Sequence, residues 1–114
     1  MRTGSCHCGA VKFTADVRVD QAMECNCSHC SRKGFMFSFI PLESFAVTAG
    51  AENLTTYTFN KHAIQHQFCS VCGCQPFGLG SNQDGTKVAA INVRCIDDID
   101  LLSVERVQVN GRGV

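Results

Sequence analysis

Residues 68–73, with the sequence FCSVCG, carry the strongest structural signal in the chain. Cys69 and Cys72 stand three positions apart, the spacing of a zinc-knuckle turn, in which two thiolates point at one metal ion. Gly73 can adopt a positive φ, which lets backbone amides point at the sulfur atoms. Such a turn supplies two ligands, so a closed tetrahedral metal site needs two more from elsewhere in the chain.

Two further cysteine clusters lie upstream, CHC at 6–8 and CNCSHC at 25–30. A disulfide framework is the alternative use of these cysteines, but nine is an odd number and frameworks usually join dispersed single cysteines. Close pairs instead favour metal binding, and zinc is the default metal for thiolate ligands. An iron–sulfur cluster is the less favoured choice, because its motifs use Cys-x-x-Cys runs rather than the Cys-x-Cys pairs found here.

The clusters divide most simply into two zinc sites. Cys69 and Cys72 join either Cys6 and Cys8 or two cysteines of the segment at 25–30. In the first arrangement, the remaining ligands form a three-cysteine site, which is typical of a catalytic zinc with one open position. Spacing alone does not exclude the swapped arrangement. The preferred sets are Cys6, Cys8, Cys69 and Cys72 for a closed structural zinc, and Cys25, Cys27 and Cys30 for an open one.

Composition indicates one small globular domain, covering residues 1–114. Apolar residues make up 45% of the chain, and ten basic residues balance ten acidic ones, so no nucleic-acid partner is expected. No apolar stretch approaches the length of a membrane-spanning helix, so no membrane partner is expected either. The first residues contain no apolar segment typical of an export signal, and we therefore expect a cytoplasmic protein whose thiols stay reduced.

Residue alternation predicts an all-β fold, in which bound zinc helps to stabilise a small core. Helix is expected only as single turns at 41–45 and 97–101. The predicted strands cover residues 10–17, 35–40, 45–50, 54–59, 63–68, 87–96 and 104–109.

Taken in order, the three clusters resemble the glutathione-dependent formaldehyde-activating enzyme family, which also includes centromere protein V. The similarity runs from about Gly4 to Leu101. The residues between the clusters that share in it are Ile40, Pro41, Phe45, Gly50, Leu54, Tyr57, the segment 91–94 and Asp97. The resemblance implies curled antiparallel sheets similar to the Mss4-like β-tent, with zinc at their junctions. It also implies the first ligand arrangement, and a carbon–sulfur lyase activity that condenses formaldehyde with glutathione to S-hydroxymethylglutathione.

An open zinc with three thiolates is suited to hold a substrate thiol as its thiolate, which attacks a small carbonyl compound. The expected partner is therefore an adduct of a small, glutathione-like thiol. Arg32 and Lys33 follow the cluster and are candidates to bind an anionic group of the substrate; the alternative is solvated surface charge. His29 is a candidate to orient the substrate, relay a proton or replace a cysteine ligand; the alternative is a residue that points to solvent.

Other functions remain open at this stage. The domain is alternatively a non-catalytic binding module for a protein or small ligand, or a thiol or metal sensor in which Cys74 resolves an oxidised three-cysteine site. Otherwise Cys74 is expected to be a non-ligand, and Cys95 a small buried residue of a strand. His62 and His66 are expected to lie in or beside a strand. For His66 the favoured position is the strand surface, and the alternative is a side chain that reaches a site.

Overall fold

The computed structural model describes residues 1–59, 64–82 and 84–110. Within these ranges strands dominate, and a single short α-helix, α1 (Ser28–Lys33), interrupts them. None of the described helices has the length and apolar character needed to cross a membrane. The strands are β1 (Arg2–Ser5), β2 (Lys12–Ala15), β3 (Gln21–Cys25), β4 (Met36–Pro41), β5 (Phe45–Ala49), β6 (Leu54–Tyr57), β7 (Gln65–Cys69), β8 (Phe77–Ser81), β9 (Lys87–Asn92) and β10 (Glu105–Val109).

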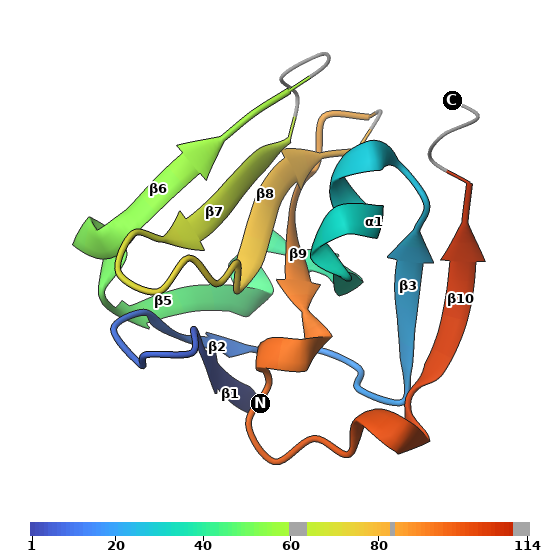
Figure 1. Ribbon diagram of the computed structural model, residues 1–114, viewed down its shortest axis with the longest axis horizontal. Helices are drawn as coiled ribbons and strands as arrows, with labels where there is room; N and C mark the ends of the chain where they lie inside the picture. The colour runs from blue at the N-terminus through green and yellow to red at the C-terminus, as the bar shows by residue number, and fades with distance from the viewer. Residues whose placement is uncertain (60–63, 83, 111–114) are drawn as a thin grey trace.

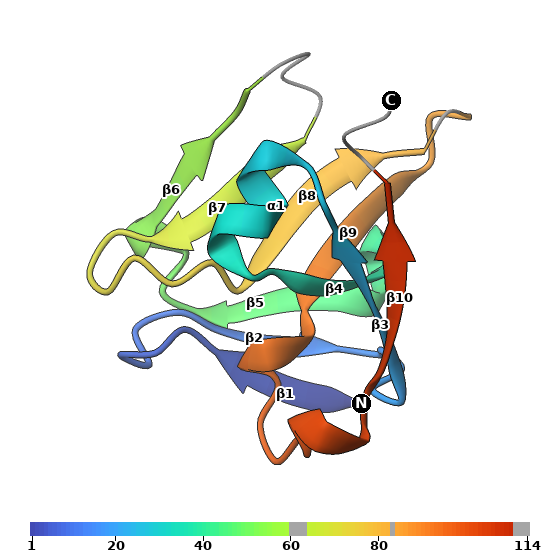
Figure 2. The same ribbon diagram turned by 45° about the vertical axis from the view of Figure 1, so that its right-hand side comes forward.

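The strands form two sheets. A small antiparallel sheet has the order β1-β2-β5, and a large one has the order β10-β3-β4-β9-β8-β7-β6. All pairs in the large sheet are antiparallel except β10 and β3, which run parallel. The small sheet lies along the lower edge of the large one, and α1 lies in front of the large sheet (Figures 1 and 2).

Alternation along the strands of the large sheet separates two buried faces. One face packs against the small sheet and forms the main core, which includes Phe13 and Phe77 at a ring-centroid distance of 6.2 Å. The opposite face carries Phe35, Phe37 and Ala90, against which Cys25 and Cys30 pack. The four-cysteine and three-cysteine clusters therefore contact opposite faces of one sheet, because Cys69 belongs to the main core.

Most of the predicted strands are confirmed, although the structure shortens several of them. The predicted strand at 87–96 ends at Asn92, whose side chain accepts a hydrogen bond from the Arg94 N–H and starts a 3₁₀ turn. The single turn near Pro41 is confirmed at 42–44. The turn predicted at 97–101 is wrong, because Asp100 instead caps a 3₁₀ turn at 101–103.

Three strands and the helix lie where the sequence predicted none. β1 and β3 are short and partly polar, and β8 contains Gly78 and Gly80, which weaken a strand pattern. The helix α1 has six residues, and its N-cap is Cys27, which is not among the usual capping residues. Its cap depends on a sulfur atom that sequence patterns do not recognise.

Substitution of Gly50 is expected to be far more destabilising than substitution of Gly34. Both glycines have positive φ, at 79° and 66°, so alanine is strained at each by roughly 1–2 kcal/mol. A Cβ on Gly50 would also collide with the carbonyl oxygen of Ala10, whereas a Cβ on Gly34 meets nothing within 4 Å. We expect Gly50→Ala to lower the free energy of unfolding by ~1–3 kcal/mol more than Gly34→Ala does, as measured by denaturant titration. Equal losses in the two variants would contradict this packing.

Candidate metal centre

The four-cysteine cluster joins the two sheets. Cys6 and Cys8 lie in the β1–β2 connection of the small sheet, while Cys69 ends β7 of the large sheet and Cys72 follows it. Their four sulfur atoms all lie within 4.8 Å of one another. Cys6 and Cys69 are buried, so the cluster lies at the margin of the main core.

The sulfur spacing suits a tetrahedral metal. The Sγ atoms of Cys6 and Cys8 are 3.6 Å apart, and those of Cys8 and Cys69 are 3.8 Å apart. A tetrahedron with Zn–S bonds of about 2.3 Å has sulfur–sulfur edges of about 3.8 Å. The residues present therefore fit zinc in both donor chemistry and spacing.

Backbone N–H groups donate hydrogen bonds to sulfur atoms of this cluster, which favours their ionised form. The N–H of Val11 donates to the Sγ of Cys6 at 3.3 Å, and the N–H of Val71 donates to the Sγ of Cys69 at 3.4 Å. A backbone hydrogen bond from Cys8 is the main cause that lowers the pKa of Cys72 to about 6. The pKa of Cys8 rises to about 11, because burial and the neighbouring thiols outweigh a hydrogen bond from Ala10. The thiols of this cluster therefore compete for ionisation, and a bound cation would favour all four as thiolates.

The three-cysteine cluster is built around the start of α1. Cys25 ends β3, Cys27 caps the helix and Cys30 lies in its first turn, with the three Sγ atoms within 4.8 Å of one another. The Sγ of Cys27 accepts the N–H of Cys30 at 3.3 Å, and the Sγ of Cys25 accepts the N–H of Cys27 at 3.4 Å. Backbone hydrogen bonds thus help to fix the sulfur atoms of Cys25 and Cys27.

As in the four-cysteine cluster, the pKa of one cysteine is lowered and that of another is raised. Burial opposes ionisation of Cys27, but hydrogen bonds from Cys30, Cys25 and the His29 backbone outweigh it and lower the pKa of Cys27. Burial and the neighbouring thiols raise the pKa of Cys30. Three sulfurs at this spacing also fit a metal ion, with one ligand fewer than a closed tetrahedral site.

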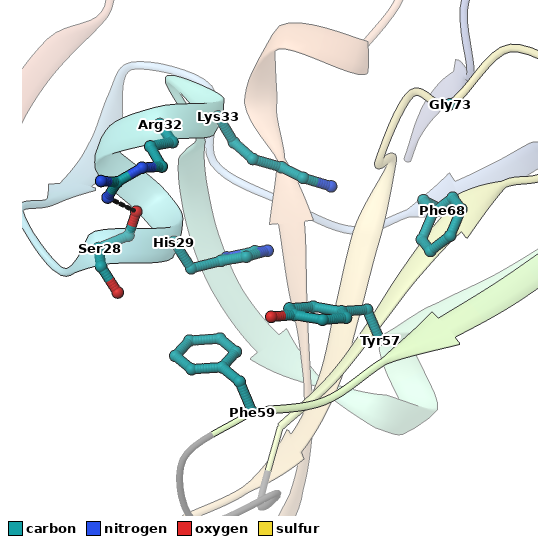
Figure 3. A pocket seen from close by; sticks show the side chains of 8 residues that line it. All are labelled: Ser28, His29, Arg32, Lys33, Tyr57, Phe59, Phe68 and Gly73. Carbon is teal, nitrogen blue, oxygen red and sulfur yellow. Dashed lines mark hydrogen bonds between the residues drawn. The ribbon is translucent and has the colours of Figure 1, made fainter.

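An open pocket of about 660 Å³ lies beside α1, and Figure 3 shows the residues that line it. His29 and Lys33 point into it from the helix, opposite Tyr57, Phe59 and Phe68 (Figure 3). Both residues of the predicted cationic pair line the pocket, but their side chains take different directions. Lys33 reaches into the pocket, whereas Arg32 turns back and donates to the carbonyl oxygen of Ser28 at 3.0 Å (Figure 3).

His29 does not point to solvent. Its ring packs on Phe59 and His66, at centroid distances of 5.1 and 4.1 Å. Both ring nitrogens are buried, and neither has a hydrogen-bond partner among the described residues. Burial lowers the pKa of His29, with a smaller contribution from Lys33, so the ring is neutral at pH 7.

The prediction that His66 lies on a strand surface is wrong. Its ring is 5% exposed, because α1 covers that face of the sheet with His29. Burial, followed by His29 and Lys33, lowers the pKa of His66 to about 4. The Nδ1 of His66 lies 3.2 Å from the Nε2 of Gln75, whose Oε1 accepts a hydrogen bond from the Lys33 ammonium at 3.0 Å. His62 lies outside the described residues.

Gln75 is the buried polar residue that sequence reasoning missed. It is 4% exposed, and the Nδ2 of Asn92 donates to its backbone carbonyl at 2.8 Å. It joins Lys33 of the helix to His66 of the sheet. The sequence signal for Gln75 was its position two residues after the Cys-x-x-Cys-Gly motif, because the segment that follows this motif passes next to the helix.

Cys74 pairs with Cys95 instead of joining either cluster. Their sulfur atoms are 3.5 Å apart, and both residues are half-buried. Burial is the largest cause that raises the pKa of Cys95, and the neighbouring Cys74 raises it further. This placement counts against a sensor in which Cys74 resolves the three-cysteine cluster.

The fold and the clusters define a class: a small all-β protein of the Mss4-like type, with two cysteine clusters able to bind metal. The chain belongs to the glutathione-dependent formaldehyde-activating enzyme family, whose model matches residues 1–109. It is also similar to a protein from Rhodobacter sphaeroides, known from its crystal structure, with 30% identity and a TM-score of 0.78. That match covers 92% of this chain and 99% of the other. Family membership relates the chain to glutathione and formaldehyde chemistry.

Proposed function

We propose that this protein is a zinc-dependent enzyme of the carbon–sulfur lyase type, acting on adducts of a small thiol with formaldehyde or another small carbonyl compound. The whole chain, 1–114, acts as one zinc-binding domain in the cytoplasm, where its nine free thiols stay reduced. Cys6, Cys8, Cys69 and Cys72 hold a structural zinc, and Cys25, Cys27 and Cys30 hold a second one. The observation that carries the proposal is the three-cysteine cluster beside a pocket that the Lys33 side chain lines.

The pocket supplies recognition of a thiol that carries a carboxylate. The ammonium of Lys33 has three donor hydrogens, of which one is used by Gln75. Burial lowers the pKa of Lys33, partly opposed by Cys74, so an anionic ligand would compensate the desolvated charge. The ring nitrogens of His29, which have no hydrogen-bond partner among the described residues, are further polar atoms beside this pocket.

The reaction is a reversible addition. A carbon–sulfur bond forms between the thiol sulfur and the carbonyl carbon, the carbonyl π bond breaks, and the thiol proton ends on the oxygen as a hydroxyl group. A zinc ion at the three-cysteine cluster supplies stabilisation of thiolate sulfur. Lys33 holds the thiol compound in place, and the aromatic rings around His29 exclude water from one side of the pocket.

Exchange spectroscopy tests the proposal directly. Protein supplied with zinc is mixed with glutathione and formaldehyde, and NMR measures the rate at which free thiol and hydroxymethyl adduct interconvert. Acceleration above the rate in buffer supports the function. A rate equal to that in buffer, with both zinc ions bound, would contradict it and leave a binding module as the function.

Lys33→Met is expected to weaken the binding of glutathione about tenfold, the loss of one charge-assisted hydrogen bond. Methionine keeps an apolar stem over Phe68, which the Lys33 ammonium approaches to 5.5 Å from the ring centroid. Arg32→Met is the matched control, because the exposed Arg32 donates to its own helix. Titration of each variant with glutathione gives the affinities. Equal losses would show that net charge, rather than Lys33, attracts the ligand.

Metal removal is expected to occur in two phases. Four thiolates enclose the first zinc, whereas three leave the second with an exchangeable position, so the second is held more weakly. Ligation requires deprotonated thiols, so both affinities fall as the pH falls. A chelator titration near neutral pH with a chromogenic zinc reporter should release one ion well before the other. Release of both ions in one phase would mean that the sites are equivalent.

A further inference from the structure

A second, smaller pocket lies on the same face of the large sheet as the three-cysteine cluster. Its volume is about 160 Å³, and most of its lining is apolar, with Phe37, Phe39 and Ile64 among the residues. Cys30 also lines it, so one proposed zinc ligand forms part of its wall. His29 lines the first pocket and His66 lines the second. Their rings, whose centroids are 4.1 Å apart, separate the two pockets.

Strand register explains why this pocket exists. Directly paired residues share a face of the sheet, and one such row crosses five strands. It contains Phe39, Ala90, Gly78, His66 and Tyr57. The small residues of β9 and β8 therefore lie between the bulky side chains of β4 and β7, and the sheet surface is hollow between them.

The glycines of β8 are not required by the backbone. Neither Gly78 nor Gly80 has a positive φ. A Cβ at Gly78 would approach no atom closer than 3.5 Å, and one at Gly80 would meet only Ile64 at 3.7 Å. Glycine weakens a strand interior and often marks the close approach of a ligand. The space that these two residues leave open thus serves something outside the fold.

His66 lines this pocket, and its hydrogen-bond contacts define which ring nitrogen carries the proton. Lysine only donates hydrogen bonds, so the contact from Lys33 fixes Oε1 of Gln75 on its side and Nε2 on the side of His66. An amide nitrogen also only donates, so Nδ1 of His66 accepts, and the neutral ring carries its proton on Nε2. Among the described residues, this Nε2–H has no hydrogen-bond partner.

We propose that the second pocket binds the carbonyl component of the substrate, that this component is an aldehyde with an aromatic or branched apolar group, and that His66 donates its Nε2–H to the aldehyde oxygen. An apolar cavity of about 150 Å³ accommodates benzene, so 160 Å³ is filled by a phenyl or branched alkyl group and left mostly empty by formaldehyde. Apolar walls with one placed donor are typical of small-molecule sites. The assignment of an aldehyde rests on the function proposed above.

Acetophenone and toluene are suitable probes, because both carry a phenyl ring, neither forms a stable thiol adduct, and only acetophenone accepts a hydrogen bond. In zinc-supplied protein, ¹⁵N NMR of the imidazoles should show His66 as the Nε2–H tautomer. Acetophenone should move the His66 Nε2 signal and the amides of Phe37, Ile64 and Ala90. Gly80→Leu fills the pocket and should abolish binding of both probes. Absence of these shifts in the wild type would overturn the proposal, whatever the enzymatic activity.

Gln75→Glu tests the hydrogen bond separately. A carboxylate accepts from Nδ1–H, so the His66 tautomer should reverse and acetophenone should bind about tenfold more weakly. Toluene binding should not change. Gln67→Glu is the matched control, because Gln67 is next to His66 on β7 but its Oε1 accepts a hydrogen bond from Thr56 instead. An unchanged tautomer, or equal losses for both probes, would overturn the role of His66.

Activity separates this proposal from the one on which it rests. Gly80→Leu should lower the rate of adduct exchange much more with benzaldehyde than with formaldehyde, because only benzaldehyde needs the volume that leucine fills. Loss of both reactions together would mean that the pocket is not specific for the apolar group. If the wild type accelerates neither reaction but binds acetophenone at the pocket, the proposed function fails while the pocket assignment stands.

Discussion

Cys69→Ser is expected to unfold the protein. Cys69 is buried in the main core, and its sulfur lies in the four-cysteine cluster that joins the two sheets. Structural zinc contributes on the order of 10 kcal/mol to the folding of isolated zinc fingers, which is comparable to the whole stability of a small domain. We therefore expect insoluble protein or the loss of a cooperative thermal transition, measured by near-ultraviolet circular dichroism.

Cys74→Ser is the control for this loss, because Cys74 lies in the next turn but contacts Cys95 outside the cluster. It should cost about 1 kcal/mol or less and keep two zinc ions per chain. A soluble Cys69→Ser variant with a cooperative transition and two bound zinc ions would contradict the ligand assignment.

Cys27→Ser is expected to abolish activity while the fold persists. Serine is a good helix N-cap, so its hydroxyl can replace the sulfur that accepts the Cys30 N–H, and α1 should remain. The three-cysteine cluster loses a thiolate, and its metal should be lost with it. Adduct exchange should fall about a hundredfold or more, since even outer partners of a metal ligand change activity by 10–100-fold.

Elemental analysis and thermal melting of Cys27→Ser separate the two clusters. One zinc per chain and a cooperative transition are expected, because the four-cysteine cluster still joins the sheets. If Cys27→Ser unfolds while Cys69→Ser does not, the structural and open sites are exchanged. Full activity of Cys27→Ser with a single zinc would place the chemistry outside the three-cysteine cluster.

Much of the fold could be predicted from the sequence because its signals are local. The strand at 35–40 has alternating phenylalanines, and the cysteine spacings restrict which thiols can meet. The strand Phe77–Ser81 could not be recognised, because two glycines in five residues are typical of a loop. Only its pairing with β9 shows that these glycines leave space on the sheet surface. The helix could not be recognised either, because its N-cap is the sulfur atom of Cys27, which accepts the N–H of Cys30 inside the three-cysteine cluster.

The grouping of seven cysteines into two clusters could be predicted from the sequence, but the arrangement of the side chains around them could not. Lys33 and Arg32 are equivalent in sequence, and the helix geometry alone sends one into the pocket and the other back to Ser28. The burial of His66 follows from pairing between strands that are distant along the chain, as does its contact with Gln75. Long-range pairing of this kind leaves no signal within a short window of residues.

The parallel pairing of β10 with β3 has a consequence for synthesis on the ribosome. Gln108 donates to Glu24 across 84 positions of the chain, and Asn26, beside Cys25, donates its backbone N–H to Val109. At 5–20 residues per second, β10 follows β3 by on the order of ten seconds. During that interval a nascent chain exposes the unpaired outer edge of β3 next to its cysteine loop. Zinc supplied early, while the edge is still open, would protect these thiols from oxidation before the last strand closes the sheet.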